Sequence, residues 1–121
     1  MASFRYIVSD VDAAVAFYRD LLGMELVEQY GPAMAILRKD DLDLWVAGPI
    51  ASASKPMPDG AQPEPGGWNR CVLVVQNLGR LVADLTEKGV TFRNAIVDGP
   101  GGQQILCTDP SGNVVELFEP N

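Results

Sequence analysis

A single carboxylate interrupts an apolar stretch close to residue 121. Glu116 stands inside "VVELF", residues 114–118, where the four neighbouring side chains favour a β-strand. An unpaired carboxylate is too costly to bury, so Glu116 must face water, a cation or a hydrogen-bond donor. The turn-forming residues "DPSGN" at 109–113 come directly before this run and predict a chain reversal. Glu116 is therefore either a surface residue or part of a site.

Histidine is absent from all 121 residues. Because histidine is the commonest transition-metal ligand and the usual general base near neutral pH, its absence excludes imidazole metal sites and Ser-His or Cys-His mechanisms. Cys71 and Cys107 match no metal-binding or CxxC spacing, and we expect both to be small core residues. Any chemistry must rest on carboxylates, arginine, tyrosine, thiols or a bound cofactor.

The composition is typical of one globular domain, with 47% hydrophobic and 21% charged residues. No apolar run approaches the ~20 residues that cross a bilayer. The first residues, "MASFRYIVSD", do not resemble a secretory signal, so we expect a cytoplasmic protein with no membrane segment. The formal net charge of -7 repels phosphate backbones, which argues against nucleic acid as a partner and favours cationic or neutral ligands.

The chain contains an internal repeat. Amphipathic helices are predicted at 11–22 and 78–88, with Asp10 and Asn77 as possible N-caps. Their apolar positions match in pairs that are 67 residues apart, namely Val11 with Leu78, Ala14 with Leu81, Val15 with Val82 and Tyr18 with Leu85. The two halves therefore look like copies of one module.

Strand-like segments extend the repeat on both sides of each helix. They lie at 3–8, 25–30 and in a hairpin at 33–46, and then at 70–75, 91–97 and in a hairpin at 103–118. We therefore expect one α+β domain over residues 1–121, built of a first βαβββ module at 1–48 and a second at 68–121. The joining stretch at 49–67 contains five prolines, so it is neither helix nor central strand. A loop of this length is a lid over a binding face or a plain spacer.

The two tandem modules, the early "VSDVDAAVAFYRDLLG" and the closing "DPSGNVVELFEP" resemble the vicinal oxygen chelate superfamily. It includes glyoxalase I, extradiol dioxygenases, fosfomycin resistance enzymes and bleomycin resistance proteins. The resemblance covers residues 3–120. It implies that the modules curl into a half-open mixed sheet with the helices outside and a ligand in the concavity. It also implies a homodimer, because such proteins commonly complete their cavities across a two-fold axis.

In metal-dependent members of that superfamily, histidines and glutamates bind the metal. The resemblance places Glu116 at the last glutamate position, and the two histidine positions fall at Ser3 and Arg70. A serine hydroxyl is a poor ligand and a guanidinium has no lone pair to donate, so we expect no metal and no cofactor. A further ligand position falls near Asp43, which we align with Glu116 by superposing the two hairpins.

Arg70 is then expected to replace the metal as a fixed cation that pairs with Glu116, with Asp43 as a second candidate partner. The alternative is that Arg70 and Glu116 form only a salt bridge that locks the two modules together. Strand alternation adds further residues to the same face, because residues two apart point the same way. The expected ligand-binding set is Ser3, Arg5, Asp43, Trp45, Trp68, Arg70, Glu116 and Phe118.

The aromatic members of this set have two interpretations. Trp45 and Phe118 either pack in the core or form a stacking platform for a planar ligand. Trp68, at the end of the joining stretch, is expected to anchor that loop or to line the mouth of a pocket.

Three functions fit these features. The first is a non-catalytic protein that binds a small organic molecule. The second is a lyase or isomerase that uses Glu116 as general base and Arg70 as oxyanion stabiliser, and that turns over an α-hydroxycarbonyl or similar substrate. The third is an interaction or structural module with a residual pocket. The sequence ranks them in this order, and it leaves open whether any reaction is catalysed.

Overall fold

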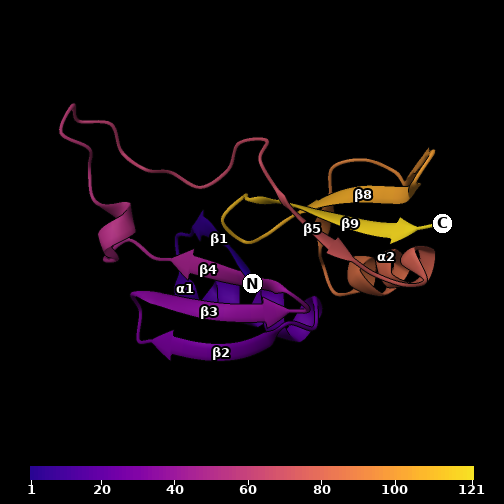
Figure 1. Cartoon of the computed structure of the whole chain (residues 1–121), viewed down its shortest axis with the longest axis horizontal. Helices are drawn as coiled ribbons and strands as arrows, with labels where there is room; N and C mark the ends of the chain where they lie inside the picture. The colour runs from indigo at the N-terminus through magenta and orange to yellow at the C-terminus, as the bar shows by residue number, and fades with distance from the viewer. The chain divides into compact units, whose positions relative to one another are not determined.

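The computed structural model describes residues 1–121 and divides them into two compact units. The first unit comprises residues 1–66 with 110–113, and the second comprises 67–109 with 114–121. Each unit contains its own sheet and its own helix (Figure 1). The predicted α+β class with two strand-helix-strand modules is therefore confirmed. No helix is long and apolar enough to span a membrane.

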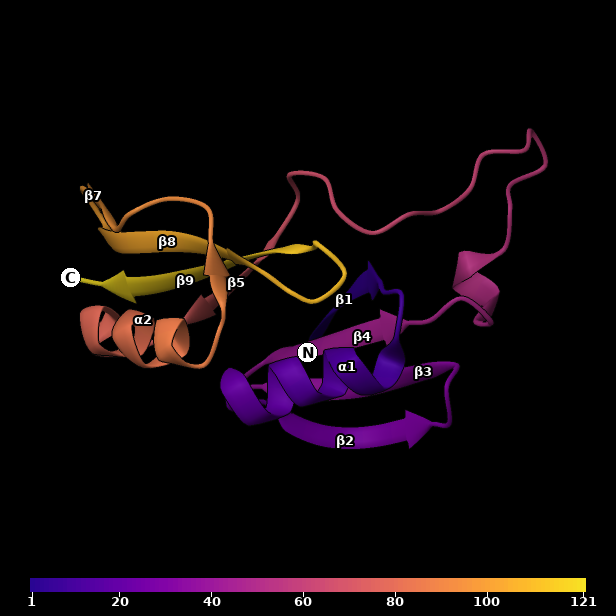
Figure 2. The ribbon, with the colours of Figure 1, turned by 180° about the vertical axis from the view of Figure 1, so that it is seen from behind.

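The first unit is a four-stranded sheet with the strand order β1-β4-β3-β2, in which only β1 and β4 run parallel. Its elements are β1 (Ala2–Ile7), α1 (Val11–Val15), the π-helix η1 (Ala16–Leu21), β2 (Glu25–Tyr30), β3 (Met34–Lys39), β4 (Leu42–Ala47) and the 3-10 turn η2 (Ser52–Ser54). The helix α1 packs against β3 and β4 and lies across one face of the sheet (Figure 2). The opposite face of this sheet has no helix of its own unit upon it.

The first helix begins as predicted and then changes its winding. Asp10 caps it, because Asp10 Oδ1 accepts a hydrogen bond from the amide of Ala13 at 3.1 Å. Beyond residue 15 the backbone is a π-helix, in which the amide of Leu22 donates to the carbonyl of Phe17 at 3.2 Å. The wider winding buries both Phe17 and Tyr18, whereas the predicted α-helical spacing had selected Tyr18 and Leu22.

The second unit is a five-stranded sheet in the order β5-β9-β8-β6, with β7 also paired to β8. Its elements are β5 (Cys71–Val74), α2 (Leu78–Glu87), β6 (Thr91–Phe92), β7 (Val97–Gly99), β8 (Gly102–Thr108) and β9 (Val114–Pro120). The strand predicted at 91–97 is therefore split in two. At the interruption, the side chain of Asn94 accepts the hydrogen bond of the Leu106 amide at 3.0 Å, in place of a neighbouring strand's carbonyl.

The helix α2 is capped from a distant part of the sequence. Asn77 stands at the N-cap position as predicted, but it has a positive φ of 53° and its side chain makes no capping hydrogen bond. The carboxylate of Glu119 instead accepts the amide of Asn77 at 2.9 Å and that of Leu78 at 3.1 Å. A negative charge at a helix N-terminus is favourable because the first amides point toward it.

The backbone register confirms the repeat and corrects one alignment. The amide of Val8 donates to the carbonyl of Ala47 at 2.9 Å, and 67 residues later the amide of Val75 donates to that of Phe118 at 2.8 Å. Phe118 is therefore equivalent to Ala47. Counting back along both strands, Glu116 is equivalent to Trp45, and the equivalent of Asp43 is Val114.

Our superposition of Asp43 on Glu116 was wrong by two residues. The two hairpins differ in turn length, with two residues between β3 and β4 and five between β8 and β9. A shift of two residues keeps each side chain on its face of the sheet, so the predicted face of Asp43 is unaffected.

The joining stretch at 49–67 is tied by hydrogen bonds of its own. Ser54 Oγ donates to the carbonyl of Gly48, and Gln62 Nε2 donates to the carbonyl of Ser54, each at 2.7 Å. At its far end the amide of Gly66 donates to Asn113 Oδ1 at 2.8 Å. After η2 the stretch has no strand pairing (Figure 1). Whether it is a lid or a spacer stays a prediction.

Candidate functional site

The first unit has a hollow of about 300 Å³ on the edge of its sheet, lined by Ser3, Phe4, Arg5 and Trp45. Strand β1 supplies the first three residues and β4 supplies Trp45. The parallel register places Arg5 directly beside Trp45. Three of the four lining residues belong to the ligand-binding set expected from the sequence, and their role in binding stays a prediction.

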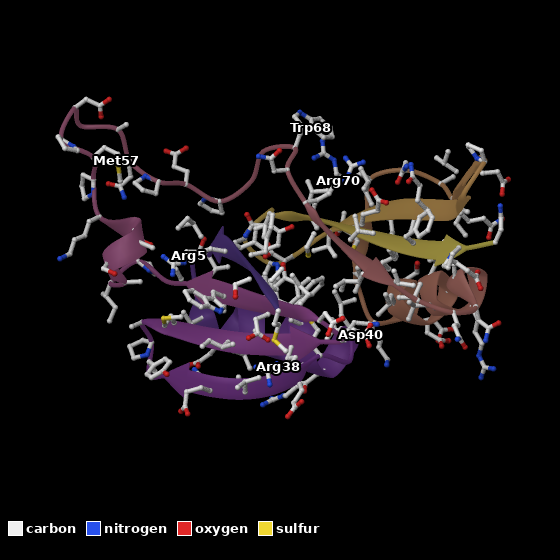
Figure 3. The ribbon with its side chains drawn as sticks, viewed as in Figure 1. Arg5, Arg38, Asp40, Met57, Trp68 and Arg70 are labelled. Atoms are coloured by element: carbon white, nitrogen blue, oxygen red, sulfur yellow. The ribbon has the colours of Figure 1, made fainter.

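Arg5 stacks on the indole of Trp45 and has no carboxylate partner. Its guanidinium carbon lies 4.9 Å from the centre of the Trp45 ring, which is a cation-π distance. Three other arginines form ion pairs, in contrast to Arg5. Arg19 pairs with Asp20, Arg38 with Asp43 and Arg70 with Glu116. Arg5 (Figure 3) therefore keeps its N–H donors available.

Trp45 also has a hydrogen-bond donor without a partner. Its indole nitrogen Nε1 is buried and has no hydrogen-bond partner. Leaving a buried donor unpaired costs about 1–3 kcal/mol, so most buried indoles find an acceptor. The sequence did not reveal this feature, because the face of a tryptophan can be read from strand alternation but its hydrogen-bond partners cannot.

Asp43 is engaged by a residue that our sequence reasoning missed. Arg38 Nε lies 2.7 Å from Asp43 Oδ1, and Arg38 Nη2 lies 3.1 Å from Asp43 Oδ2. These hydrogen bonds lower the pKa of Asp43 and raise the pKa of Arg38. Arg38 and Asp43 are paired in the register of the hairpin whose two-residue turn is Asp40 and Asp41. A two-residue turn at these positions would have predicted this pairing from the sequence. Arg38 is labelled in Figure 3 on β3.

The second unit holds the predicted pair of Arg70 and Glu116. Arg70 Nε donates to Glu116 Oε1 at 3.0 Å, which answers why a carboxylate stands in an apolar strand. Glu116 is 7% exposed, and the side chain of Arg70 is 30% exposed. Both residues belong to the second unit, so the interpretation of a bridge that locks the two modules together is wrong. The pair links β9 to the residue preceding β5.

The second unit also has apolar side chains beside this pair, and it contains a second arginine-tryptophan stack. Val72 lies beside Glu116 and Val74 beside the half-buried Phe118. Trp68, at the entry to β5 (Figure 3), is 67% exposed. The guanidinium carbon of Arg93 lies 4.2 Å from the centre of the Trp68 ring, a contact that no pattern in the sequence predicted.

The positions that the resemblance assigns to histidine ligands hold Ser3 and Arg70. No group of three histidine, cysteine, aspartate or glutamate side chains comes together in the chain. Arg70 is a cation at that position and has no lone pair to donate. The thiol of Cys107 is also unsuitable as a nucleophile, because burial raises its pKa to about 12.

The sequence model of the Glyoxalase/Bleomycin resistance protein/Dioxygenase superfamily matches residues 1–117. The chain belongs to this superfamily. This confirms the resemblance seen in the sequence. No curated protein matches the chain.

Solved structures of the superfamily share the fold over nearly the whole chain. A member of the superfamily from Sphaerobacter thermophilus DSM 20745 is 29% identical, with a TM-score of 0.76, and the alignment covers 98% of this chain and 95% of that one. TnmS3, an antibiotic binding protein from Streptomyces sp. CB03234, is 26% identical, with a TM-score of 0.74 and coverage of 98% and 93%. Lactoylglutathione lyase from Agrobacterium tumefaciens is similar in fold, at 21% identity, a TM-score of 0.73 and coverage of 98% and 92%.

Proposed function

We propose that this superfamily member binds a small organic molecule in the hollow of Ser3, Arg5 and Trp45, without a transition metal. The observation that carries the proposal is that two hydrogen-bond donors at this hollow have no acceptor. Arg5 has no acid partner and Trp45 Nε1 has no acceptor, on a sheet face that no helix of the unit covers. A volume of about 300 Å³ is within the range of small-molecule sites.

The relatives favour binding over catalysis. The antibiotic binding protein TnmS3 is more similar to this chain in sequence than the lactoylglutathione lyase is, at 26% against 21% identity. At 21% identity the lyase shows only a shared fold, so it gives no support for a lyase activity here.

Catalysis without a metal is the second candidate, because Arg70 and Glu116 are in direct contact at 3.0 Å on the open face of the second sheet. In that case Glu116→Gln should abolish turnover of an α-hydroxycarbonyl substrate while leaving its binding in place. Loss of binding together with turnover would contradict this role.

A screen of small aromatic and heterocyclic compounds, read by ligand-observed NMR, tests the binding proposal. Trp45→Ala should remove the saturation-transfer signals of the hits. Tyr30→Ala is the matched control, because Tyr30 is an exposed aromatic on β2 of the same unit, outside the hollow. Hits that bind Trp45→Ala as well as the unaltered protein would contradict the proposal.

Two further properties belong to this proposal. Elemental analysis after dialysis should find no stoichiometric Zn, Ni, Fe or Mn, and one equivalent per chain would refute metal independence.

We also propose a homodimer, because β1, β2 and β5 are uncovered sheet edges within their units. Light scattering should give about twice the chain mass of 13.0 kDa, and a monomer at micromolar concentration would contradict it.

A further inference from the structure

The hollow of the first unit offers hydrogen-bond donors and a positive charge without an opposing acceptor. We propose that its ligand is a planar organic anion, an aromatic carboxylate of about bicyclic size. This inference rests on the proposed function, because it names the class of molecule that the same hollow would take. It reverses the expectation from net charge, which favoured cationic or neutral ligands.

Three of the residues that line the hollow carry hydrogen-bond donors. Arg5 carries a guanidinium with a planar fork of N–H groups that matches a carboxylate, Ser3 adds a hydroxyl, and Trp45 adds an indole N–H. The nearest carboxylate by register is Asp43, which lies opposite Ser3 across β1 and β4. Asp43 accepts two hydrogen bonds from Arg38, so its charge is already compensated from β3. A cationic ligand would find no free acid in the hollow.

The net charge of -7 does not overrule this local arrangement. Charges spread over a surface are screened beyond a Debye length of about 8–10 Å at moderate salt, whereas a ligand in the hollow touches Arg5 directly. The overall charge would slow the approach of an anion, and the contact would determine which ligand stays bound.

The Trp45 ring in the lining of the hollow favours a flat ligand, because planar groups stack on an aromatic face. The Trp45 ring already accepts a planar cation, the Arg5 guanidinium, on one face at 4.9 Å. A hollow of about 300 Å³ is at the small end of ligand sites, which limits the bound molecule to about two fused rings. Because Trp45 Nε1 has no accessible surface in the free protein, binding must shift the neighbouring side chains for this donor to reach the ligand.

Three probes of one shape test the inference on the full chain, namely 2-naphthoate, 2-naphthamide and 2-naphthylmethylammonium. Isothermal titration calorimetry at pH 7 should show the carboxylate binding at least tenfold more tightly than the amide, and the ammonium binding most weakly. The ¹⁵N–¹H resonance of the Trp45 indole, identified by its loss in Trp45→Phe, should shift with the carboxylate.

Arg5→Gln should remove the preference for the acid, and Arg5→Lys should retain part of it, since lysine keeps the charge but lacks the fork. Arg80→Gln is the matched control, because Arg80 is an exposed arginine on α2 whose loss changes the net charge equally. A ratio of acid to amide affinity that survives Arg5→Gln would overturn the inference while leaving the proposed function intact. An amide or ammonium that binds as tightly as the acid would do the same. If no probe moves the Trp45 resonance, the inference and the proposed hollow both fail.

Discussion

Removing the guanidinium of Arg70 should destabilise the protein by about 2 kcal/mol. Breaking a fully buried pair costs about 3–5 kcal/mol, because the remaining charge has no partner. Glu116 is buried at 7% exposure, but the side chain of Arg70 is 30% exposed, so water replaces part of the lost interaction. For 121 residues, an unfolding entropy of ~2.1 cal/mol/K per residue converts about 2 kcal/mol into a fall in Tm of about 8 °C.

The assay is a set of thermal melts by circular dichroism on Arg70→Ala, Glu116→Gln and the double variant. The double variant should recover about half of the loss caused by Arg70→Ala, because the uncompensated charge is gone. Arg19→Ala is the matched control, since Arg19 and Asp20 are in contact at 2.8 Å but their side chains are 47% and 56% exposed. That change should leave Tm almost unaltered.

Full additivity between positions 70 and 116 would refute the reasoning, because it would show that the two side chains do not meet. Arg70→Lys separates a structural pair from a ligand site. If the pair only stabilises the second unit, ligand affinity will change no more than stability does. If it contacts ligand, affinity should fall further than stability, since lysine lacks the planar fork.

Three other predictions concern stability and reactivity. The buried Cys107 thiol, with a pKa of about 12, should resist iodoacetamide at pH 8 in the folded protein and react after denaturation; modification at the unfolded rate would contradict its burial. Because Arg38 lowers the pKa of Asp43 in the folded state, their contribution to stability is present above the usual value of 3.8 and is lost as pH falls below it. The Tm difference between the unaltered protein and Asp43→Asn should therefore vanish in acid, and a constant difference would exclude this linkage. Glu119→Ala removes the cap of α2 and should lower stability by about 1 kcal/mol, whereas Glu64→Ala in the joining stretch should have no effect.

The sequence predicted the modules because their signals are local and periodic. The spacing of 67 between Val11 and Leu78 places both helices, and strand alternation places Arg5 and Trp45 on the open face. Features that depend on a distant partner were missed or misassigned. Glu119 caps α2 from 41 residues away, and its carboxylate gives no local sign of that role. The change to π winding after Val15 likewise has no sequence signal that we used.

The corrected register shows how two equivalent positions have acquired different chemistry. Position 5 faces 45 in the first unit, and the repeat places 72 opposite 116 in the second. The first pair is a cation stacked on an indole, and the second is a valine beside a glutamate that Arg70 already compensates. Arg70 is therefore paired with an acid in the second unit, whereas Arg5 at the hollow of the first unit is not. Since an isolated cation gains most from an anion that it can contact directly, a ligand should be anchored at Arg5 rather than at Arg70.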